Sequence, residues 1–401
     1  MGRGSSGDDP ADDTPGAAPA GRTPPRLSGH RHLPGHVRRQ EVPPVPTPRG
    51  ARGPSRDEVE AAAREQRRRR RRWWGAGAGL AVVAATVVGF TLSEGPISRS
   101  LPWSDPQGAN PFADRGLYTW PDAQAAVAAD TVEAQGRADD AATLRRLADV
   151  PTAIWLTPEA HGRGEVGDHV RRIVADAADA DEVAVFVVYG VTDRDCTGQL
   201  SAGGLPPEEY AAWVGEIASA LGTGDGAAAA VLEPDGLAAT FECGNTDQRV
   251  ELLAGALGSL VDAGVPTYVD AGHSDWRPVD EMADLLRRVG VEKARGFATN
   301  VAGYQADADE TPYAEALSSR LGGAHYVTDS GRNGAPSTSE WCNPDARLLG
   351  DEPAAVDDGS ARDAHLWVKP PGESDGTCNG GPDAGVFWVE RALSMAAASG
   401  W

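Results

Sequence analysis

Acidic side chains follow several short apolar runs in the C-terminal three-quarters of the sequence. The run at 228–232 leads to Asp235, and Asp195, Asp270 and Asp375 follow or close similar runs. Carboxyl groups that share one site repel each other, so the pKa of at least one rises and that group can hold a proton near neutral pH. Two carboxyl groups in such a site can hydrolyse a glycosidic bond, one as acid and one as base.

Other side chains at the ends of these runs are also suited to binding carbohydrate. A single acid at such a position could instead cap a helix or shape a turn, because aspartate is common before helices. Six acids in matching positions are better explained by a shared site. Tryptophans could add flat apolar faces for sugar rings, and core packing is their alternative role. The set comprises Trp155, Tyr189, Asp193, Asp195, Asp235, Asp270, His273, Trp276, Asn300, Asp329, Trp341, Lys369, Glu373 and Asp375.

The spacing of the apolar runs predicts the elements that position these side chains. Alternating strands and helices indicate one α/β domain with a parallel sheet. Because the runs are apolar at successive positions, the sheet should be covered on both faces. About seven units favour a closed barrel over an open sheet, and the carboxyl ends of barrel strands meet at one mouth. The predicted strands are 151–156, 182–190, 228–236, 266–273, 295–300, 325–331 and 363–372, and the predicted helices include 208–221, 246–263, 279–289, 313–321 and 386–398.

The first 109 residues differ in composition from the rest. Residues 1–72 are rich in proline, glycine and arginine and should form a disordered cytoplasmic arm. Residues 73–92 carry no charge and follow six consecutive arginines, a pattern that predicts one transmembrane signal anchor. A cleaved signal peptide is the alternative. Residues 93–109 then form a linker and 110–401 the catalytic domain, on the extracellular face of the membrane or secreted.

Charge is unevenly distributed along the chain. Residues 1–72 carry a formal net charge of +7 within a total of -22, so the remainder carries -29. A domain this acidic is not expected to bind nucleic acid, and a neutral polysaccharide is a more suitable partner. Solubility alone could also account for the acid excess.

The four cysteines indicate two disulfides, as expected for an exported chain. Sequence order suggests Cys196–Cys243 and Cys342–Cys378, among three possible pairings. No CxxC pair is present, so we expect no zinc site. The absence of GxGxxG after the first run argues against a dinucleotide cofactor.

Six motifs carry a resemblance to a known family. They are VVYGVTDRDC (187–196), VLEPDGLA (231–238), YVDAGHSDW (268–276), GFATNVAGY (296–304), WCNPDARLLG (341–350) and WVKPPGESDGTC (367–378). In this order they resemble glycoside hydrolase family 6, which comprises inverting endoglucanases and cellobiohydrolases acting on β-1,4-glucan. The resemblance extends from about Asn110 to the end of the chain. It implies a distorted, TIM-barrel-like barrel of seven parallel strands, the disulfide pairing suggested above, and no metal or organic cofactor.

The resemblance also implies roles for individual residues. Asp235 matches the general acid, and Asp195 matches the aspartate that keeps this acid protonated. Tyr189 matches the tyrosine that crowds the sugar and favours its distortion. Asp375 matches the candidate base, and Ser201 matches a serine that helps to hold the attacking water. The implied substrate-binding or cleft-lining positions are Trp155, Asp270, His273, Trp276, Asn300, Trp341, Lys369 and Glu373.

The lengths of two loops bear on where the chain would be cut. Little sequence follows the ATN motif or Asp375 before the next predicted helix. These two loops are too short to form the roof that cellobiohydrolases of the resembled family carry, which favours an open groove and an endoglucanase. Inversion would place the carboxyl groups of Asp235 and Asp375 roughly 6.5–9.5 Å apart.

The alternatives are an exo-acting cellobiohydrolase, a mixed-linkage or envelope β-glucanase, and a non-catalytic carbohydrate-binding protein on the same fold. We expect a monomer.

Overall fold

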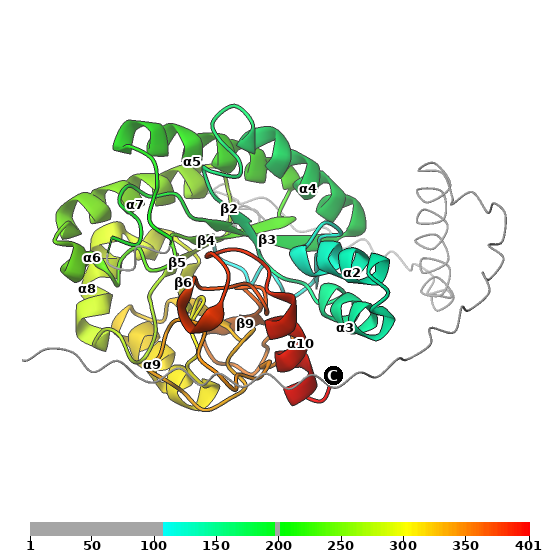
Figure 1. The fold of residues 1–401 in the computed structure, drawn as a ribbon. Coiled ribbons are helices and arrows are strands. Elements are labelled where there is room, and N and C mark those ends of the chain that lie inside the picture. Colours follow the sequence, from blue (N-terminus) through cyan, green and yellow to red (C-terminus); the bar gives the residue numbers. More distant parts are fainter. Residues whose placement is uncertain (1–106, 197–200) are drawn as a thin grey trace, which may run out of the picture. The chain divides into compact units, whose positions relative to one another are not determined.

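The computed structural model describes residues 107–196 and 201–401 (Figure 1). The predicted arm, the predicted membrane segment and most of the predicted linker lie outside these residues. Within them, no helix combines the length and the apolar character needed to span a bilayer.

The described residues form a sheet whose main strands are all parallel. Seven parallel strands follow one another in the order β2, β3, β4, β5, β6, β7 and β9, and they coincide with the seven predicted runs. Two short strands extend the pattern, because β1 also pairs with β3 and β8 pairs antiparallel with β9. The strands are β1 (Gly116–Leu117), β2 (Ile154–Leu156), β3 (Glu182–Val188), β4 (Ala228–Leu232), β5 (Thr267–Asp270), β6 (Gly296–Thr299), β7 (His325–Asp329), β8 (Ala354–Ala355) and β9 (Arg362–Leu366).

The sheet is almost closed into a barrel. The chain just before β2 meets the chain just after β9 through a parallel bridge between Thr152 and Trp367. The N–H of Ala153 donates to the carbonyl of Trp367 at 2.9 Å, and the indole Nε1 of Trp155 donates to the carbonyl of Val368 at 2.8 Å. The seam is therefore held by a few contacts and not by a full ladder.

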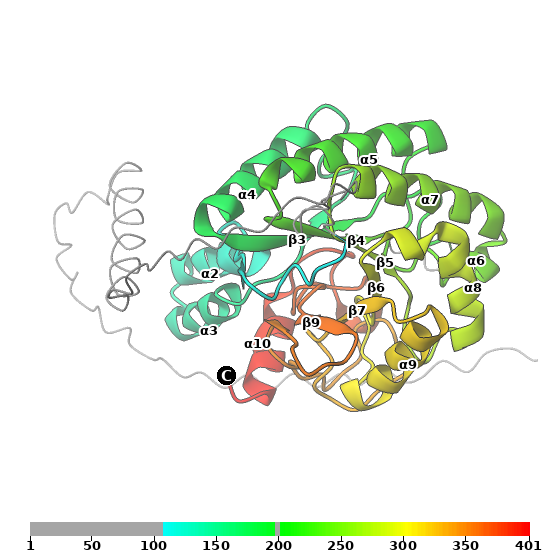
Figure 2. The same ribbon diagram turned by 180° about the vertical axis from the view of Figure 1, so that it is seen from behind.

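Helices cover the outside of this barrel (Figures 1 and 2). In β3, Val183, Val185 and Val187 belong to the apolar cluster inside the barrel, whereas Phe186 and Val188 pack in the larger cluster that includes the helices. Burial on both faces explains why the strand sequences show no alternation of polar and apolar residues. The helices are α2 (Gln124–Ala134), α3 (Ala138–Ala148), α4 (Val166–Ala180), α5 (Pro207–Leu221), α6 (Thr240–Cys243), α7 (Thr246–Asp262), α8 (Val279–Val289), α9 (Asp307–Arg320) and α10 (Val389–Ala398).

Two predicted helix starts differ from the structure by more than one residue. Helix α9 begins at Asp307, six residues before the predicted start at 313. Its first turn contains Asp307, Asp309 and Glu310, which suit a helix N-terminus electrostatically but present no apolar stripe. Helix α10 begins at Val389, three residues later than predicted.

A buried ionic cluster joins three strands at the end of the barrel opposite the acid-rich loops. Arg295, just before β6, donates from Nε and Nη2 to the two carboxylate oxygens of Asp363 in β9, each at 2.7 Å. The hydroxyl of Tyr268 in β5 donates to the same carboxylate at 2.6 Å. The side chains of Arg295 and Asp363 are only 4% and 3% exposed. Removal of either partner would leave the other as an uncompensated buried charge.

We predict that Asp363→Ala lowers the free energy of unfolding by about 3–5 kcal/mol, the usual cost of breaking a buried ion pair from one side. Urea denaturation measures this change. Asp284→Ala is the control, because Asp284 pairs with Arg287 on the surface, where both side chains are largely exposed. Its effect should stay below about 1 kcal/mol. Similar small losses in both variants would contradict the assigned role of Asp363.

Candidate active site

The predicted acid Asp235 lies in the loop that follows β4. Glu233 and Asp235 both have left-handed backbone conformations, with φ of 48° and 65°. The N–H of Asp235 donates to Oδ2 of Asp270 at 2.9 Å, and the N–H of Gly272 donates to the same oxygen at 3.0 Å. Asp270 is 1% exposed. It therefore ties the end of β5 to the loop that carries Asp235.

The surroundings of Asp235 favour its protonated form. Burial and the negative charges of Asp195 and Asp375 raise the pKa of Asp235 to about 7, although Lys369 opposes this shift. Burial and then the charge of Asp235 also raise the pKa of Asp270 well above its usual range. The fold thus brings the predicted acid, its partner and the candidate base within electrostatic reach of one another.

The loop after β3 holds Asp195 next to Ser201. The N–H of Ser201 donates to Oδ2 of Asp195 at 2.8 Å. The guanidinium of Arg194 braces both ends of the loop, because Nε donates to the carbonyl of Ser201 and Nη1 to that of Tyr189, each at 3.0 Å. The same guanidinium lies over the Tyr189 ring, 4.7 Å from its centroid.

Gly190 has little space for a side chain. A Cβ at this position would approach the ring of buried Trp213 to 2.7 Å and Pro158 to 3.0 Å. Both oxygens of Glu233 accept from the N–H of Gly190, at 2.9 and 3.1 Å. The buried Glu233 therefore connects the end of β4 to the turn after Tyr189.

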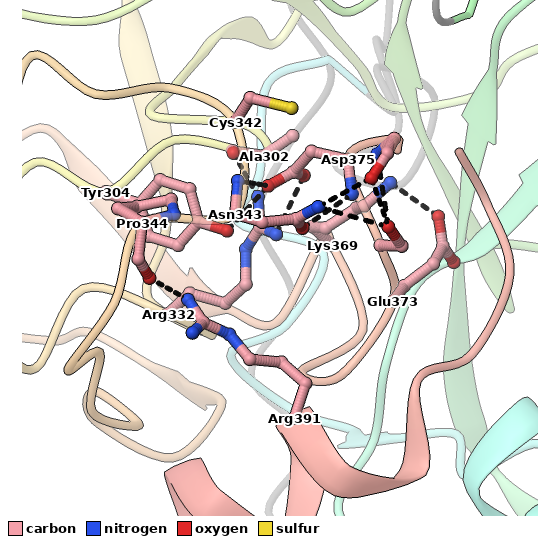
Figure 3. Close-up of polar contacts among 12 residues, drawn as sticks. Ala302, Tyr304, Arg332, Cys342, Asn343, Pro344, Lys369, Glu373, Asp375 and Arg391 are labelled. Carbon is pink, nitrogen blue, oxygen red and sulfur yellow. Dashed lines mark hydrogen bonds and ion pairs between the residues drawn. The ribbon is translucent and has the colours of Figure 1, made fainter. Parts of the chain in front are cut away.

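Asp375 is held by three donors (Figure 3). Its Oδ1 accepts from Nη1 of Arg332 at 2.9 Å, and its Oδ2 accepts from the hydroxyl of Tyr304 at 2.6 Å and the N–H of Asn343 at 3.1 Å. Burial alone would raise the pKa of Asp375, but Arg332, Lys369 and Tyr304 together lower it below its usual value. The carboxyl group is therefore ionised near neutral pH.

Lys369 and Glu373 form an ion pair beside the predicted aromatic positions. Nζ of Lys369 lies 2.5 Å from Oε1 of Glu373, and Nε2 of Gln124 donates to Oε2 of Glu373 at 3.1 Å. Nζ of Lys369 is also 5.2 Å from the Trp155 ring centroid. The Trp155 ring packs edge-on against Tyr189, with centroids 5.3 Å apart. These predicted positions therefore form one continuous group.

The remaining predicted aromatic positions differ in their exposure. Trp341 is 56% exposed, whereas Trp276 is half-buried and its ring lies 5.5 Å from that of His273. Both tryptophans follow polar loop segments and present part of their surface to solvent. This arrangement is compatible with stacking against sugar rings.

Two residues from the predicted strand-end set make hydrogen bonds within the fold. Asn300 is fully buried, its Nδ2 donates to the carbonyls of Gln305 and Asp329 at 3.1 and 2.9 Å, and its Oδ1 accepts from the N–H of Gln305. Both N–H groups of this buried amide are therefore engaged with backbone carbonyls, and its role as a substrate contact stays a prediction. The carboxylate of Asp329 likewise accepts hydrogen bonds from four backbone N–H groups, those of Ala302, Gly331, Val368 and Lys369.

Sequence reasoning missed the residues that surround Asp375. Tyr304 and Asn343 lie inside the quoted GFATNVAGY and WCNPDARLLG motifs, so their positions carried a signal that was not used. Arg332 lies three residues beyond the end of β7. A search for polar side chains a few residues further past each strand would have found it. All three bind Asp375 across long sequence separations, which periodicity does not reveal.

Both suggested disulfides are present. Cys196 is bonded to Cys243 and Cys342 to Cys378. The first bond joins the Asp195 loop to the end of α6, and the second joins the loop of Trp341 to the segment after Asp375. No cluster of three or more metal-ligating side chains occurs among residues 107–196 and 201–401.

We predict that Asp235→Asn stabilises the protein in a pH-dependent manner. Because the pKa of Asp235 rises on folding, the wild-type protein loses stability as the pH increases from about 4 to about 7. Asparagine carries no charge and tolerates the left-handed backbone. The variant should gain on the order of 3 kcal/mol at pH 8 and almost nothing at pH 4. Thermal unfolding at both pH values, with exposed Asp275→Asn as control, measures this, and an equal gain at both pH values would refute it.

Comparison with known proteins agrees with this geometry. The model described as "Glycosyl hydrolases family 6" matches residues 112–399. Endoglucanase A of Cellulomonas fimi is 45% identical over 265 residues, which cover 65% of this chain and 57% of that protein. Endoglucanase A of Thermobispora bispora is 38% identical over 261 residues, covering 63% and 56%. The chain thus spans little more than half the length of these two relatives.

A solved structure has the same barrel. The endoglucanase Cel6 of Mycobacterium tuberculosis, in complex with methyl-cellobiosyl-4-deoxy-4-thio-β-D-cellobioside, is 38% identical. It superposes with a TM-score of 0.68, and the match covers 73% of this chain and 100% of that one. The family match extends over most of the chain and includes each loop that carries a predicted catalytic residue. The chain therefore belongs to glycosyl hydrolases family 6.

Proposed function

We propose that this protein hydrolyses internal β-1,4-glucosidic bonds of cellulose or a related β-glucan, with inversion at the anomeric carbon. The observation that carries the proposal is the contrast between two carboxyl groups. Asp235 has a pKa raised to about 7 by burial and by its acidic neighbours, whereas Asp375 has a lowered pKa and stays ionised. A protonated and an ionised carboxyl group in one site are what an inverting glycosidase requires.

In this proposal Asp235 protonates the oxygen that leaves as the bond breaks. Its proton is retained up to about pH 7 because burial and then the negative charge of Asp195 oppose ionisation. As the bond to the leaving oxygen lengthens, the same negative charge stabilises the positive charge that develops on the sugar ring. Asp195 thus serves two purposes without itself transferring a proton.

Asp375 is the proposed base for the attacking water. Its ionised state suits this role, but its bonds to Arg332, Tyr304 and Asn343 limit its basicity. Proton acceptance would therefore have to accompany the development of positive charge on the sugar, and could not precede it. We propose that Ser201, which is bonded to the carboxylate of Asp195 through its N–H, helps to hold the water.

The proposed substrate contacts flank these carboxyl groups. Tyr189 and Trp155, which pack edge-on, would position the sugar at the bond that is cleaved. The ion pair of Lys369 and Glu373 offers charged hydrogen-bond partners for sugar hydroxyl groups. Trp276 and Trp341 would provide stacking faces further along the glucan chain.

We favour internal cleavage because the loops near the site are short. Only residues 300–306 separate β6 from α9, and residues 376–388 separate Asp375 from α10. Asn300 is itself committed to bracing the first of these loops. An exo-acting cellobiohydrolase would need a longer enclosure over the chain.

We also propose that the domain acts outside the cytoplasm. Its two disulfides suit an oxidising compartment. Residues 73–92, which we predict from sequence to anchor the domain in the membrane or to direct its secretion, lie outside the described residues.

We predict that Asp235→Ala reduces the turnover of carboxymethyl cellulose by at least about 100-fold, because general acid catalysis is lost. Asp275→Ala, at an exposed position near Trp276, should retain wild-type activity. NMR of products released from cello-oligosaccharides should first detect the α-anomer. Equal activity of wild type and Asp235→Ala would remove Asp235 from the mechanism, and an inactive wild type would favour a non-catalytic binding protein.

We predict that Asp195→Asn moves the alkaline limb of the kcat/KM profile to lower pH. Removal of the Asp195 charge removes one cause of the raised pKa of Asp235, so the acid loses its proton at lower pH. Asp193→Asn is a matched control, because Asp193 has the same left-handed backbone two residues earlier but lies on the surface. The alkaline limb should stay in place in this control, and a shift of the same size there would argue against a specific effect of Asp195.

A further inference from the structure

Two loops of the site carry left-handed acidic residues. In the loop after β3, Asp193 and Asp195 have φ of 53° and 49°, and in the loop after β4, Glu233 and Asp235 have φ of 48° and 65°. Such conformations cost free energy for residues other than glycine. They persist where surrounding contacts over-determine the backbone. Some group must therefore hold each loop in place.

One buried side chain contacts both loops. Arg249 lies in the first turns of α7 and is 2% exposed. Its Nη2 donates to the carbonyls of Thr192 and Asp193, each at 3.0 Å. Its Nη1 donates to the carbonyl of Gly236, the residue after Asp235, at 3.3 Å. A single rigid guanidinium thus links the backbone just before Asp195 to the backbone just after Asp235.

The electrostatic cost of this arrangement indicates that the contacts matter. Burial lowers the pKa of Arg249, and the nearby charge of Glu233 opposes that effect. Within the part of the chain that the structure describes, no carboxylate lies within ion-pair distance of this guanidinium, and its partners are backbone carbonyls. A buried cation is costly when its hydrogen-bond partners are neutral carbonyl groups. Its presence here indicates that these three carbonyl groups need to be held in place.

The other side of the Asp195 loop is fixed independently. Cys196, the residue after Asp195, is bonded to Cys243 at the end of α6. Arg249 therefore holds the loop upstream of Asp195 and the disulfide holds it downstream. Glu233 already joins the loop of Asp235 to the N–H of Gly190 at the start of the Asp195 loop. Arg249 is a second side chain that joins the two loops, and it does so close to both Asp195 and Asp235.

We propose that Arg249 is a positioning residue that sets the separation between Asp195 and Asp235 by holding their loops on one guanidinium. This inference rests on the proposed function, in which Asp195 keeps Asp235 protonated. Lysine has a single ammonium group and cannot reproduce the planar fork that reaches three carbonyls. Even a conservative change at this position should therefore alter the spacing of the two carboxyl groups.

The test compares Arg249→Lys and Arg249→Met with the wild-type full chain. Misplacement of reacting groups by about 1 Å can cost about 100-fold in rate. We expect kcat on a defined cello-oligosaccharide to fall by about 10- to 100-fold and KM to change by less than about threefold, since Arg249 contacts no proposed substrate position. The alkaline limb of kcat/KM should also move to lower pH, because a displaced Asp195 raises the pKa of Asp235 less.

A double-variant comparison separates positioning from general destabilisation. In the Asp195→Asn background, Arg249→Lys should cause no further shift of the alkaline limb, because the charge that it positions is already absent. Arg288→Lys is the matched control, since Arg288 pairs with Asp247 on the surface. It should leave kcat, KM and the pH profile unchanged.

The outcomes distinguish this inference from the proposed function. If the wild type fails to cleave the oligosaccharide, the proposed function fails. If the wild type is active and Arg249→Lys keeps its kcat and pH profile, only the role of Arg249 is overturned. Failure of both Arg249 variants to fold, judged by circular dichroism and thermal unfolding, would also overturn it, because a separable positioning role requires a folded variant.

Discussion

Repulsion between carboxyl groups that burial forces together is the constraint on which this site depends. Asp195 and Asp375 both raise the pKa of the buried Asp235, and separate networks keep the three carboxyl groups in place. Asp270 holds the backbone of Asp235, Ser201 binds Asp195, and Arg332 neutralises Asp375. Without these networks the loops could relax apart, and the pKa values of Asp235 and Asp375 would no longer diverge.

The barrel makes such crowding possible because its core is independent of the site. The strands bury apolar side chains on both faces, and the cluster of Arg295, Asp363 and Tyr268 stabilises the opposite end. Stability generated there can offset the unfavourable left-handed residues and buried acids in the loops. Much of the barrel thus serves to keep the left-handed residues and the buried acids of these loops in place.

Sequence alone revealed the strands well because each is a short apolar run bounded by polar residues. It also located Asp195, Asp235 and Asp375, since a parallel barrel gathers strand ends at one mouth. It did not reveal whether a strand-end side chain faces substrate or turns back to brace a loop. Asn300 and Asp329 show this limit, because their hydrogen bonds go to backbone groups that become neighbours only after folding.

The acidic start of α9 was missed for a related reason. A pattern search detects apolar stripes, whereas Glu310 in this helix is buried as a polar group that accepts from the N–H of Ser274 at 3.0 Å. Arg249 was missed likewise, because it resembles any surface arginine of an amphipathic helix until its carbonyl partners are known. Long-range polar contacts of this kind carry no local period.

The seam of the barrel has a consequence for when the proposed active site is completed during synthesis. The strands that meet there, β2 and β9, are the first and last of the seven main parallel strands, and Trp155 and Lys369 approach each other across them. Asp375 follows the seam in sequence. A growing chain therefore cannot assemble the complete site until its final segment is available. Contacts of such high sequence separation are slow to form, so the proposed site should be completed as one of the last events of folding.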